Sequence, residues 1–367
     1  MSKRDDIKRI WQESFSDTRE YVRMYFEQVY RDDDALLLHD AEGVPVSSLL
    51  LQHYSMSFHG ATPPVSYIAG AATRRNQRGK GYMTELMRMA LAESAQRGDM
   101  LCALIPANEA LYYFYRRYGF STVFYTKEQR FTALHPFSVK NEYHHLDDFS
   151  SSDVWKAFDH FQRERECYIL HSERDFKNIL SDLRATGGDF VVMTHGETDG
   201  EKASEGQLPS NIASMAWAEM RDDILLVTDV MGDSADSRMA ALRQLRGIHG
   251  DTPVLLYGRP TDTMGGRLMP RGMCRVVNVQ LALSIIAEAY PEFSSTIRVT
   301  DPILQDVNSH TFVVDKGECV IKDDIADAKL DFDVSIDVFT DILFSAPETG
   351  EILKFPSVRP MISLMLD

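Results

Sequence analysis

The feature that most constrains the fold is a strand, a basic turn, a helix and a second strand in direct succession over residues 65–106. Val65–Thr73 is a run of small and apolar residues typical of a buried strand, and so is Met100–Pro106. Between them, the basic segment Arg74–Gly81 is followed by apolar residues at helical spacing, which predict a helix over about 83–97. This order predicts an α/β unit in which the helix covers one face of a sheet that contains both strands.

The flanking sequence extends this unit over the first 135 residues or so. Apolar periodicity and turn residues predict a helix over 7–30, strands over 35–39 and 44–53, a loop over 54–64, a helix over 109–117 and a strand that begins at 119. Strands and helices therefore alternate through the segment, as in a single α/β domain.

Two further units follow. The polar stretch 140–153 is typical of a linker, and residues 195–210 are polar and glycine-rich, as in a mobile excursion. The second unit is predicted to hold helices over 153–165, 173–184 and 234–246 and strands over 189–194, 212–219, 223–230 and 253–257. The third is predicted to hold a strand-to-helix element over 276–290, strands over 295–300, 311–314, 318–321 and 328–334, a helix over 336–344 and a tail to 367. The predicted domains are 1–135, 136–274 and 275–367.

Composition excludes several classes of protein. Apolar residues make up 44% and charged residues 26% of the 367 residues, as in ordinary globular domains. The apolar runs are far shorter than the ~20 residues of a membrane helix, and the first residues lack the apolar stretch of a signal peptide. We therefore expect a cytoplasmic protein without membrane association. The four cysteines form no close pair and no histidine shows metal-ligand spacing, so we expect neither a disulfide framework nor a metal site.

The acidic residues lie mostly beyond the first unit. Residues 1–130 carry 17 Lys and Arg against 16 Asp and Glu, so the net charge of −16 comes from the rest of the chain. This acidity argues against nucleic acid as a partner, because such binding needs a basic surface. It favours cationic ligands over anionic ones, although solubility alone would also explain it.

The turn before the predicted helix at 83–97 has the composition of an anion site. A helix N-terminus carries unpaired N–H groups and the positive end of the dipole, and Gly79 and Gly81 let the backbone approach an anion closely. The spacing is neither that of a P-loop nor that of the Rossmann fingerprint. On this turn alone, phosphate binding and an ordinary basic surface turn both stay open.

A second segment, from Asn108 to Phe120, begins with a helix-capping residue and is rich in tyrosine. Tyr112, Tyr113, Tyr115 and Tyr118 all have aromatic packing as their simplest role.

Together the two segments resemble the motifs of the GNAT superfamily of N-acetyltransferases. Arg78-x-x-Gly81-x-Met83 resembles its Q/R-x-x-G-x-G/A turn, and the segment from Asn108 to Phe120 resembles its N-x-x-A-x-x-F-Y-x-x-x-G-F motif. The intervening residues 84–107 also fit the family's spacing. Met83 stands where Gly or Ala is usual, and Leu111 stands where Ala is usual.

The whole chain resembles the enhanced-intracellular-survival family of N-acetyltransferases, whose members also carry an apolar residue at the position of Met83. The resemblance implies an α/β (α+β) chain with two tandem GNAT-like mixed-sheet domains, the second degenerate, and a C-terminal domain like sterol carrier protein. It also implies a homo-oligomer. Arg275–Val279 resembles the family's entry into the third domain, and Ser14–Asp17 resembles a segment that places an acidic residue in the substrate pocket. Helix capping is the alternative role for Asp17, since Glu20 lies nearby at the start of a helical run.

The same resemblance implies acetyl-CoA as co-substrate, without a metal, and gives the site residues. Those implied to bind the cofactor are Ala71, Thr73, Arg78, Gly79, Gly81, Met83, Thr84 and Asn108. Tyr115 holds the position of the general acid that protonates the leaving thiolate, with packing as its alternative role. The base is implied to be the carboxylate at the end of the chain, at Asp367, by its main chain or its side chain. Asp17 is implied to bind the substrate.

The function that follows from the resemblance is transfer of an acetyl group from acetyl-CoA to a primary amine. The acidic composition favours a small cationic acceptor like an aminoglycoside or a polyamine. A protein or peptide N-acetyltransferase, a non-catalytic lipid-binding protein and a regulatory module that has lost activity are the alternatives.

Overall fold

The computed structural model describes residues 2–147, 151–196, 211–262, 265–325 and 329–366. In the first part of the chain the elements are α1 (Lys3–Ser14), α2 (Arg19–Met24), the π-helical turn η1 (Tyr25–Val29), β1 (Ala35–His39), β2 (Pro45–Ser57), β3 (Pro64–Thr73), the 3-10 turn η2 (Arg75–Gln77), α3 (Tyr82–Gln96), β4 (Leu101–Leu104), α4 (Glu109–Arg116) and β5 (Ser121–Phe131). The middle part holds β6 (Tyr143–His145), α5 (Ser151–Arg163), β7 (Tyr168–Leu170), α6 (Glu173–Thr186), β8 (Asp189–His195), β9 (Ile212–Arg221), β10 (Ile224–Gly232), α7 (Ala235–His249), β11 (Val254–Gly258) and β12 (Arg267–Val276). The last part holds α8 (Val279–Ala289), β13 (Ser295–Thr300), α9 (Gln305–Asn308), β14 (Thr311–Asp315), β15 (Glu318–Ile321), β16 (Phe332–Ser335), α10 (Ile336–Leu343) and α11 (Pro347–Leu353).

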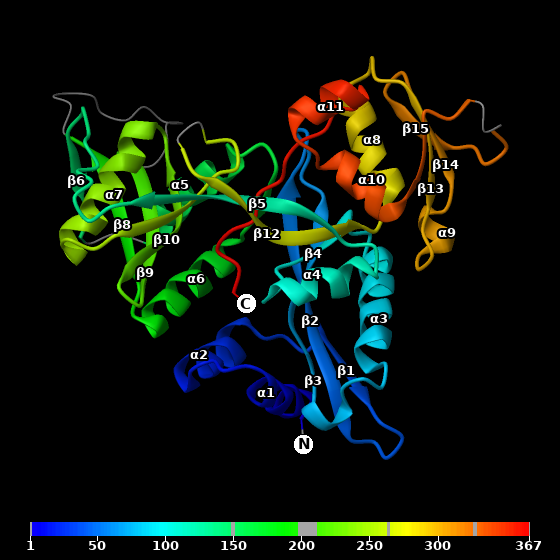
Figure 1. Cartoon of the computed structure of the whole chain (residues 1–367), viewed down its shortest axis with the longest axis horizontal. Helices are drawn as coiled ribbons and strands as arrows, with labels where there is room; N and C mark the ends of the chain where they lie inside the picture. The colour runs from blue at the N-terminus through cyan, green and yellow to red at the C-terminus, as the bar shows by residue number, and fades with distance from the viewer. Residues whose placement is uncertain (1, 148–150, 197–210, 263–264, 326–328, 367) are drawn as a thin grey trace.

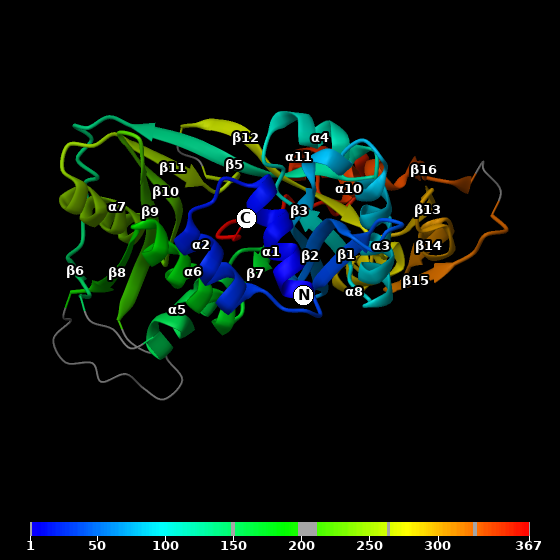
Figure 2. The same ribbon diagram turned by 90° about the horizontal axis from the view of Figure 1, so that it is seen from below.

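The architecture is mixed α/β, with one large and one small sheet. Strands of the large, 12-stranded sheet follow the order β1-β2-β3-β4-β12-β5-β11-β10-β9-β8-β6, and β7 pairs with β2. The small sheet has the order β15-β14-β13-β16. In both views the N-terminal strands lie between the middle part of the chain and the small sheet (Figures 1 and 2).

Alternating residues of β2 bury opposite faces of the N-terminal sheet. Leu50 belongs to the apolar cluster that contains Trp11 of α1, whereas Leu49 and Leu51 belong to the cluster that contains Leu86 of α3. This is the two-residue period of a strand that is covered on both faces. Helix α3 therefore lies on one face of the sheet, as predicted, and α1 lies on the other.

The helix predicted over 7–30 is wrong as a single element. The helix ends at Ser14, and a new one begins after Thr18, whose hydroxyl accepts from the N–H of Tyr21 at 3.1 Å. Both segments turn apolar residues toward the same core, so the apolar spacing continues across a break in the backbone. The predicted loop over 54–64 is also shorter than expected, because β2 continues to Ser57 and β3 begins at Pro64.

Strand β12 completes the N-terminal sheet, although in sequence it begins at Arg267, far beyond the end of β5 at Phe131. Met273–Val276 pair with Leu101–Leu104 of β4, and residues 267–274 pair with β5. Strand β5 in turn pairs with β11. The first and middle parts of the chain therefore share one continuous sheet.

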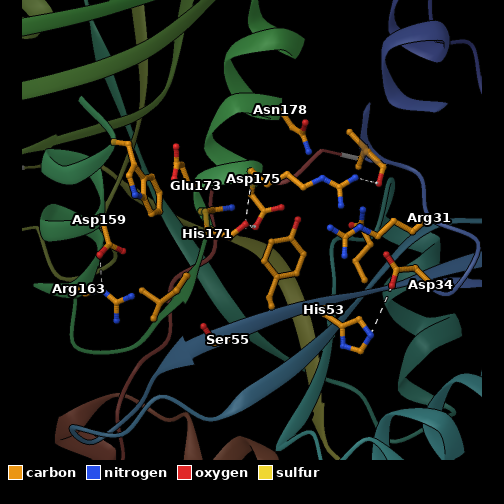
Figure 3. Close-up of a pocket in the computed structure, with 17 residues that line it drawn as sticks. Arg31, Asp34, His53, Ser55, Asp159, Arg163, His171, Glu173, Asp175 and Asn178 are labelled. Carbon is orange, nitrogen blue, oxygen red and sulfur yellow. Dashed lines mark hydrogen bonds and ion pairs between the residues drawn. The ribbon is translucent and has the colours of Figure 1, made fainter. Parts of the chain in front are cut away.

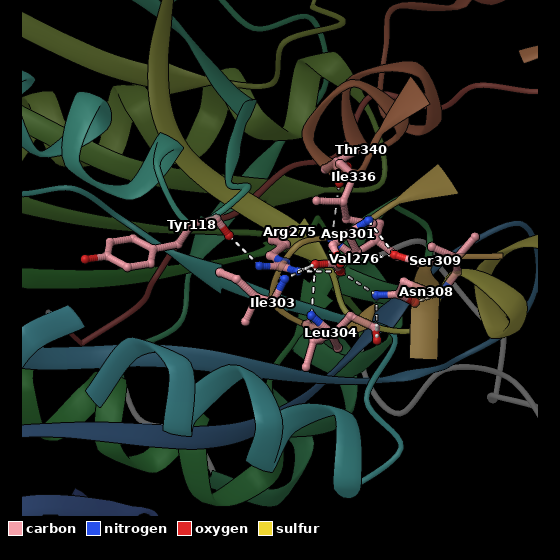
Figure 4. A network of polar contacts seen from close by, with 12 residues as sticks. Tyr118, Arg275, Val276, Asp301, Ile303, Leu304, Asn308, Ser309, Ile336 and Thr340 are labelled. Carbon is pink, nitrogen blue, oxygen red and sulfur yellow. Dashed lines mark hydrogen bonds and ion pairs between the residues drawn. The ribbon is translucent and has the colours of Figure 1, made fainter. Parts of the chain in front are cut away.

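A fully buried ion pair joins the C-terminal part of the chain to the N-terminal sheet (Figure 4). Arg275, on β12, bonds both carboxylate oxygens of Asp301 and also donates to the carbonyl of Tyr118. The Asp301 carboxylate accepts from Asn308 Nδ2 at 2.9 Å and from the N–H of Leu304 at 3.0 Å. Burial alone would raise the pKa of Asp301, but Arg275 and these donors hold it below its usual value.

The C-terminal segment is packed between the two halves of the large sheet (Figures 1 and 2). Met361 donates to the carbonyl of Cys167 at 2.8 Å, and its own carbonyl accepts from the N–H of Ile169 at 3.3 Å. Met365 and Leu366 are less than a tenth exposed. The apolar tail is thus a buried part of the fold.

Candidate active site

Strands β3 and β4 diverge at the centre of the N-terminal sheet. Their parallel pairing covers Val65–Tyr67 and then ends, although β3 continues to Thr73. Beyond that point β3 pairs only with β2 among the described residues. Backbone groups on the other edge of β3, including those of Ala71, are therefore available to a ligand that lies between the strands.

The turn after β3 leads to an uncapped helix N-terminus. Gly79 and Gly81 have φ of 79° and 89°, values that glycine adopts without strain. Gly81 is the N-cap of α3 and provides no side-chain cap, so the first-turn N–H groups at Tyr82, Met83 and Thr84 lack that partner. A Cβ at Gly79 or Gly81 would meet nothing within 4 Å, so the turn is open on its outer side.

The basic residues of this turn are partly engaged within the protein. The guanidinium of Arg78 donates to the carbonyl of Thr73 at 3.1 Å, which fixes both predicted cofactor residues in one loop. The Thr73 hydroxyl lies 2.8 Å from that of Ser47. Arg74 forms an ion pair with Glu13 at 3.0 Å.

Tyr115 is buried on α4 beside the end of β4. It is 7% exposed, and its ring packs against Phe114 and Phe120. Burial raises the pKa of Tyr115 to about 12, with a smaller contribution from Cys102 on β4. The phenol therefore stays protonated well above neutral pH.

Tyr118 links the two predicted motifs. Its hydroxyl lies 2.7 Å from the hydroxyl of Thr84, in the first turn of α3. Its main chain accepts from Arg275. The sequence indicated only packing for Tyr118, since nothing local to it identifies a partner 34 residues away.

Two predicted binding residues lie on the surface. Asn108 is the N-cap of α4 but makes no side-chain capping bond, so its amide is free of that role. Asp17 is exposed and accepts from the indole N–H of Trp11 at 2.7 Å. Because Thr18 caps α2, the capping role considered for Asp17 is wrong.

The described end of the tail is fixed by a polar cluster. The hydroxyl of Ser363 donates to Asp229 and lies 2.8 Å from that of Tyr168. Asp229 forms a buried ion pair with Arg165 at 2.7 Å. The predicted base, Asp367, lies outside the described residues.

A cavity of about 540 Å³ opens beside this tail (Figure 3). Its walls come from η1 and the segment up to β1, from β2, from α5 and from the start of α6. The lining residues include Arg31, Asp34, Gln52, His171, Arg174 and Asn178. The Nε2 of His171 donates to the carbonyl of Ser363 at 3.0 Å, so this wall touches the tail.

The cavity adjoins the point at which β3 and β4 diverge. Residues 52–55 of β2 line it, and they pair with residues 64–67 of β3, directly before the freed edge. The cavity thus lies beside the paired part of β3, and the glycine-containing turn at 78–83 follows its unpaired part. The sequence did not indicate this cavity, because its walls come from segments that are far apart in the chain.

The described residues contain no helix long and apolar enough to span a membrane. They also contain no group of three or more His, Cys, Asp or Glu side chains arranged to hold a metal ion.

Comparison with known proteins places this geometry in context. Residues 1–123 match the family model of the acetyltransferase (GNAT) domain. No curated protein sequence matches the chain.

Solved structures match over nearly the full length. A probable N-acyltransferase from Enterococcus faecalis V583 has a TM-score of 0.75 at 14% identity, with 99% of this chain and 97% of that chain covered. A GCN5-related N-acetyltransferase from Anabaena variabilis has a TM-score of 0.76 at 14% identity, with 98% and 96% covered. Eis1 from Mycobacterium abscessus has a TM-score of 0.70 at 14% identity, with 97% and 91% covered. The chain thus carries, at its N-terminus, an acyl-CoA-dependent N-acyltransferase domain of the GNAT family, within an Eis1-like fold.

Proposed function

We propose that the protein transfers an acetyl group from acetyl-CoA to a primary amine of a small molecule. The freed edge of β3 supports this proposal most directly, because it leads into the turn before the uncapped N-terminus of α3. Ala71 on this part of β3 also packs against the apolar cluster that contains the buried Tyr115. The expected acceptor is cationic, like an aminoglycoside or a polyamine. The three-domain organisation with boundaries near 135 and 274, a sterol-carrier-like third domain and a homo-oligomer are parts of the same proposal.

The co-substrate is held by backbone groups rather than by a large charge. The N–H groups of Gly79, Gly81, Met83 and Thr84 bind the pyrophosphate at the positive end of α3, with Arg78 beside them. The pantetheine arm runs along the freed edge at Ala71 and Thr73, and Asn108 contacts it from the other side. This arrangement also polarises the thioester carbonyl, since N–H groups on the edge point toward it.

The proton inventory requires one acid and one base. Tyr115 donates its phenolic proton to the sulfur as the thiolate leaves, and burial keeps the phenol protonated until then. The carboxylate at Asp367 takes one proton from the acceptor ammonium, and the neutral amine then attacks the thioester carbonyl. The second N–H proton leaves the nitrogen as the tetrahedral intermediate collapses, and it restores the phenol of Tyr115 by way of solvent. The cavity beside the tail holds the acceptor. Asp17, which is exposed and is not among the residues that line the cavity, is proposed to bind the substrate from outside it.

The experiment compares two tyrosines on the same helix. Tyr115→Phe removes the buried hydroxyl, and we expect turnover of acetyl-CoA to fall roughly 10²–10⁴-fold while coenzyme A binding by calorimetry is unchanged. Tyr113→Phe is the matched control, because Tyr113 is 65% exposed. The amines tested are polyamines, aminoglycosides and lysine peptides. Equal turnover by the two variants would contradict the role of Tyr115, and absence of coenzyme A binding would contradict the function as a whole.

A further inference from the structure

The cavity beside the C-terminal tail is lined by arginines as well as by carboxylates. Three arginines line it, at positions 31, 163 and 174, together with Asp34, Asp159, Glu173 and Asp175. Which of these charges are already neutralised decides what the cavity can bind.

Most of the carboxylates are engaged within the protein. Asp159 forms an ion pair with Arg163 at 2.9 Å, and Glu173 forms one with Lys177 at 2.7 Å. Asp175 accepts from the N–H of Ser172 at 2.8 Å in the capping box of α6. These groups are therefore occupied as acceptors before any ligand enters.

The remaining two arginines have no carboxylate partner in the described part of the chain. Arg174 donates to the carbonyl of Gln28 at 2.7 Å, which uses only one arm of its guanidinium. Arg31 follows Gln28 by three residues and makes no hydrogen bond or ion pair within the described ranges. The contact between Arg174 and the end of η1 therefore brings two unpaired guanidinium groups to the same side of the cavity.

The cavity also contains a buried polar side chain without an internal partner. Asn178 is 6% exposed, and its amide makes no hydrogen bond with another described residue. Figure 3 shows it directed from α6 into the space above Arg31 and Asp34. An amide in the wall of a cavity that is not bonded within the protein is available to a ligand or to water.

One further carboxylate faces the same space. Asp34 is 6% exposed, and its only ion pair in the described residues is a long one with His53, at 3.7 Å. Burial raises the pKa of Asp34, while His53 and Arg31 act in the opposite direction. The cavity thus offers one acidic acceptor beside two free cationic donors.

We infer that the acceptor of the acetyl group carries an oxyanion, a carboxylate or a phosphate, in addition to its amine. The oxyanion binds Arg31 and Arg174, whose planar donors suit such groups, and Asn178 contributes its amide. The amine points along β2 past Gln52 toward the divergence of β3 and β4. This inference rests on the proposed function and narrows it, because polyamines and aminoglycosides lack the oxyanion.

The test uses acceptors in pairs that differ only in the anionic group. Lysine peptides with a free C-terminal carboxylate are compared with their C-terminal amides, and phosphoethanolamine is compared with ethanolamine. In the full-length protein, kcat/KM for the anionic member should exceed that of its partner roughly tenfold or more, the scale of a charge-assisted hydrogen bond. The two pairs separate a preference for carboxylate from one for phosphate.

Variants assign the preference to the arginines. Arg174→Met and Arg31→Met should each reduce kcat/KM for the anionic member several-fold more than for its partner without the anionic group. Arg174→Lys should retain part of the preference. Arg184→Met is the matched control, since Arg184 is an exposed residue near the other end of α6. The inference would be overturned if the enzyme preferred the member without the anionic group. It would also be overturned if neither Met variant altered the preference for the anionic member.

A binding measurement separates this inference from the proposed function. Calorimetry with the same pairs on the coenzyme A-loaded protein reports the preference of the cavity without turnover. Preferential binding of the anionic members without acetylation would support the oxyanion site and contradict the proposed acetyl transfer. Acetylation of amines with no preference in binding or turnover would sustain the reaction and contradict the oxyanion site.

Discussion

The buried pair of Arg275 and Asp301 makes a sharp prediction about stability. Both side chains are 0% exposed, and the carboxylate accepts from the guanidinium, from Asn308 and from backbone N–H groups. Asp301→Ala would leave the Arg275 guanidinium in the interior with no counter-charge. Loss of one partner of a buried ion pair costs about 3–5 kcal/mol, so we expect the free energy of unfolding to fall by about that amount.

Urea unfolding of the full chain measures this loss as a shift in the transition midpoint. The matched control is Asp333→Ala, which removes the carboxylate of a surface pair with Arg298 at 3.7 Å, where Asp333 is 57% exposed. Surface pairs contribute about 0–1 kcal/mol, so the control should shift the midpoint little.

A double substitution distinguishes the loss of the charge pair from a general loss of packing. Arg275→Met combined with Asp301→Leu removes both charges and keeps apolar volume, and we expect it to regain part of the stability lost in Asp301→Ala. The recovery is partial because the donors of Leu304 and Asn308 still lack their acceptor. A shift in Asp301→Ala no larger than that of the surface control would refute the reasoning. So would a double variant less stable than the single one.

Three further predictions concern the active site. Gly81→Ala should raise the KM for acetyl-CoA, because an alanine at φ 89° is strained by about 1–2 kcal/mol and reorients the N–H groups proposed to bind the pyrophosphate. The control Gly98→Ala, at φ 78° beyond the other end of α3, should lose similar stability with an unchanged KM. The same KM for acetyl-CoA in the two variants would contradict the proposed anion site. Burial raises the pKa of Tyr115 to about 12, so the phenol stays protonated as the pH rises and kcat should stay level from about pH 8 to 10. A fall in kcat over that range that is absent in Tyr115→Phe would contradict this pKa for the general acid. Deletion of Asp367 should abolish turnover and preserve coenzyme A binding, because it removes the proposed base. Asp367→Asn tests the contribution of the side chain alone. Full turnover by the deletion variant would exclude Asp367 as the base.

Local sequence patterns predict the elements to which we assign cofactor binding. The strand at 65–73, the turn at 78–83 and the helix from about 83 follow from apolar, glycine and basic residues that are contiguous in sequence, and the structure has them at 64–73 and from Tyr82. The sequence alone therefore identifies the residues of this turn, and their roles are part of the proposed function.

Features that depend on distant segments were not predictable in the same way. Apolar spacing predicts one continuous helix over 7–30, because residues of two separate helical segments, such as Trp11 and Tyr25, pack against the same core. Strand β12 contains Pro270 and Gly272, which hide its strand character, and only its pairing with β4 and β5 defines it. The cavity and the partner of Arg275 arise from tertiary contacts, for which a single sequence gives no spacing rule.

The position of β12 between β4 and β5 has a consequence for biosynthesis. During translation, the N-terminal sheet keeps two unpaired edges until residue 276 has left the ribosome, since no earlier strand fills the gap. Such edges recruit other strands and promote aggregation. A fragment that ends near residue 135 would carry the same open edges permanently, so the first acetyltransferase unit is expected to be insoluble when it is produced alone.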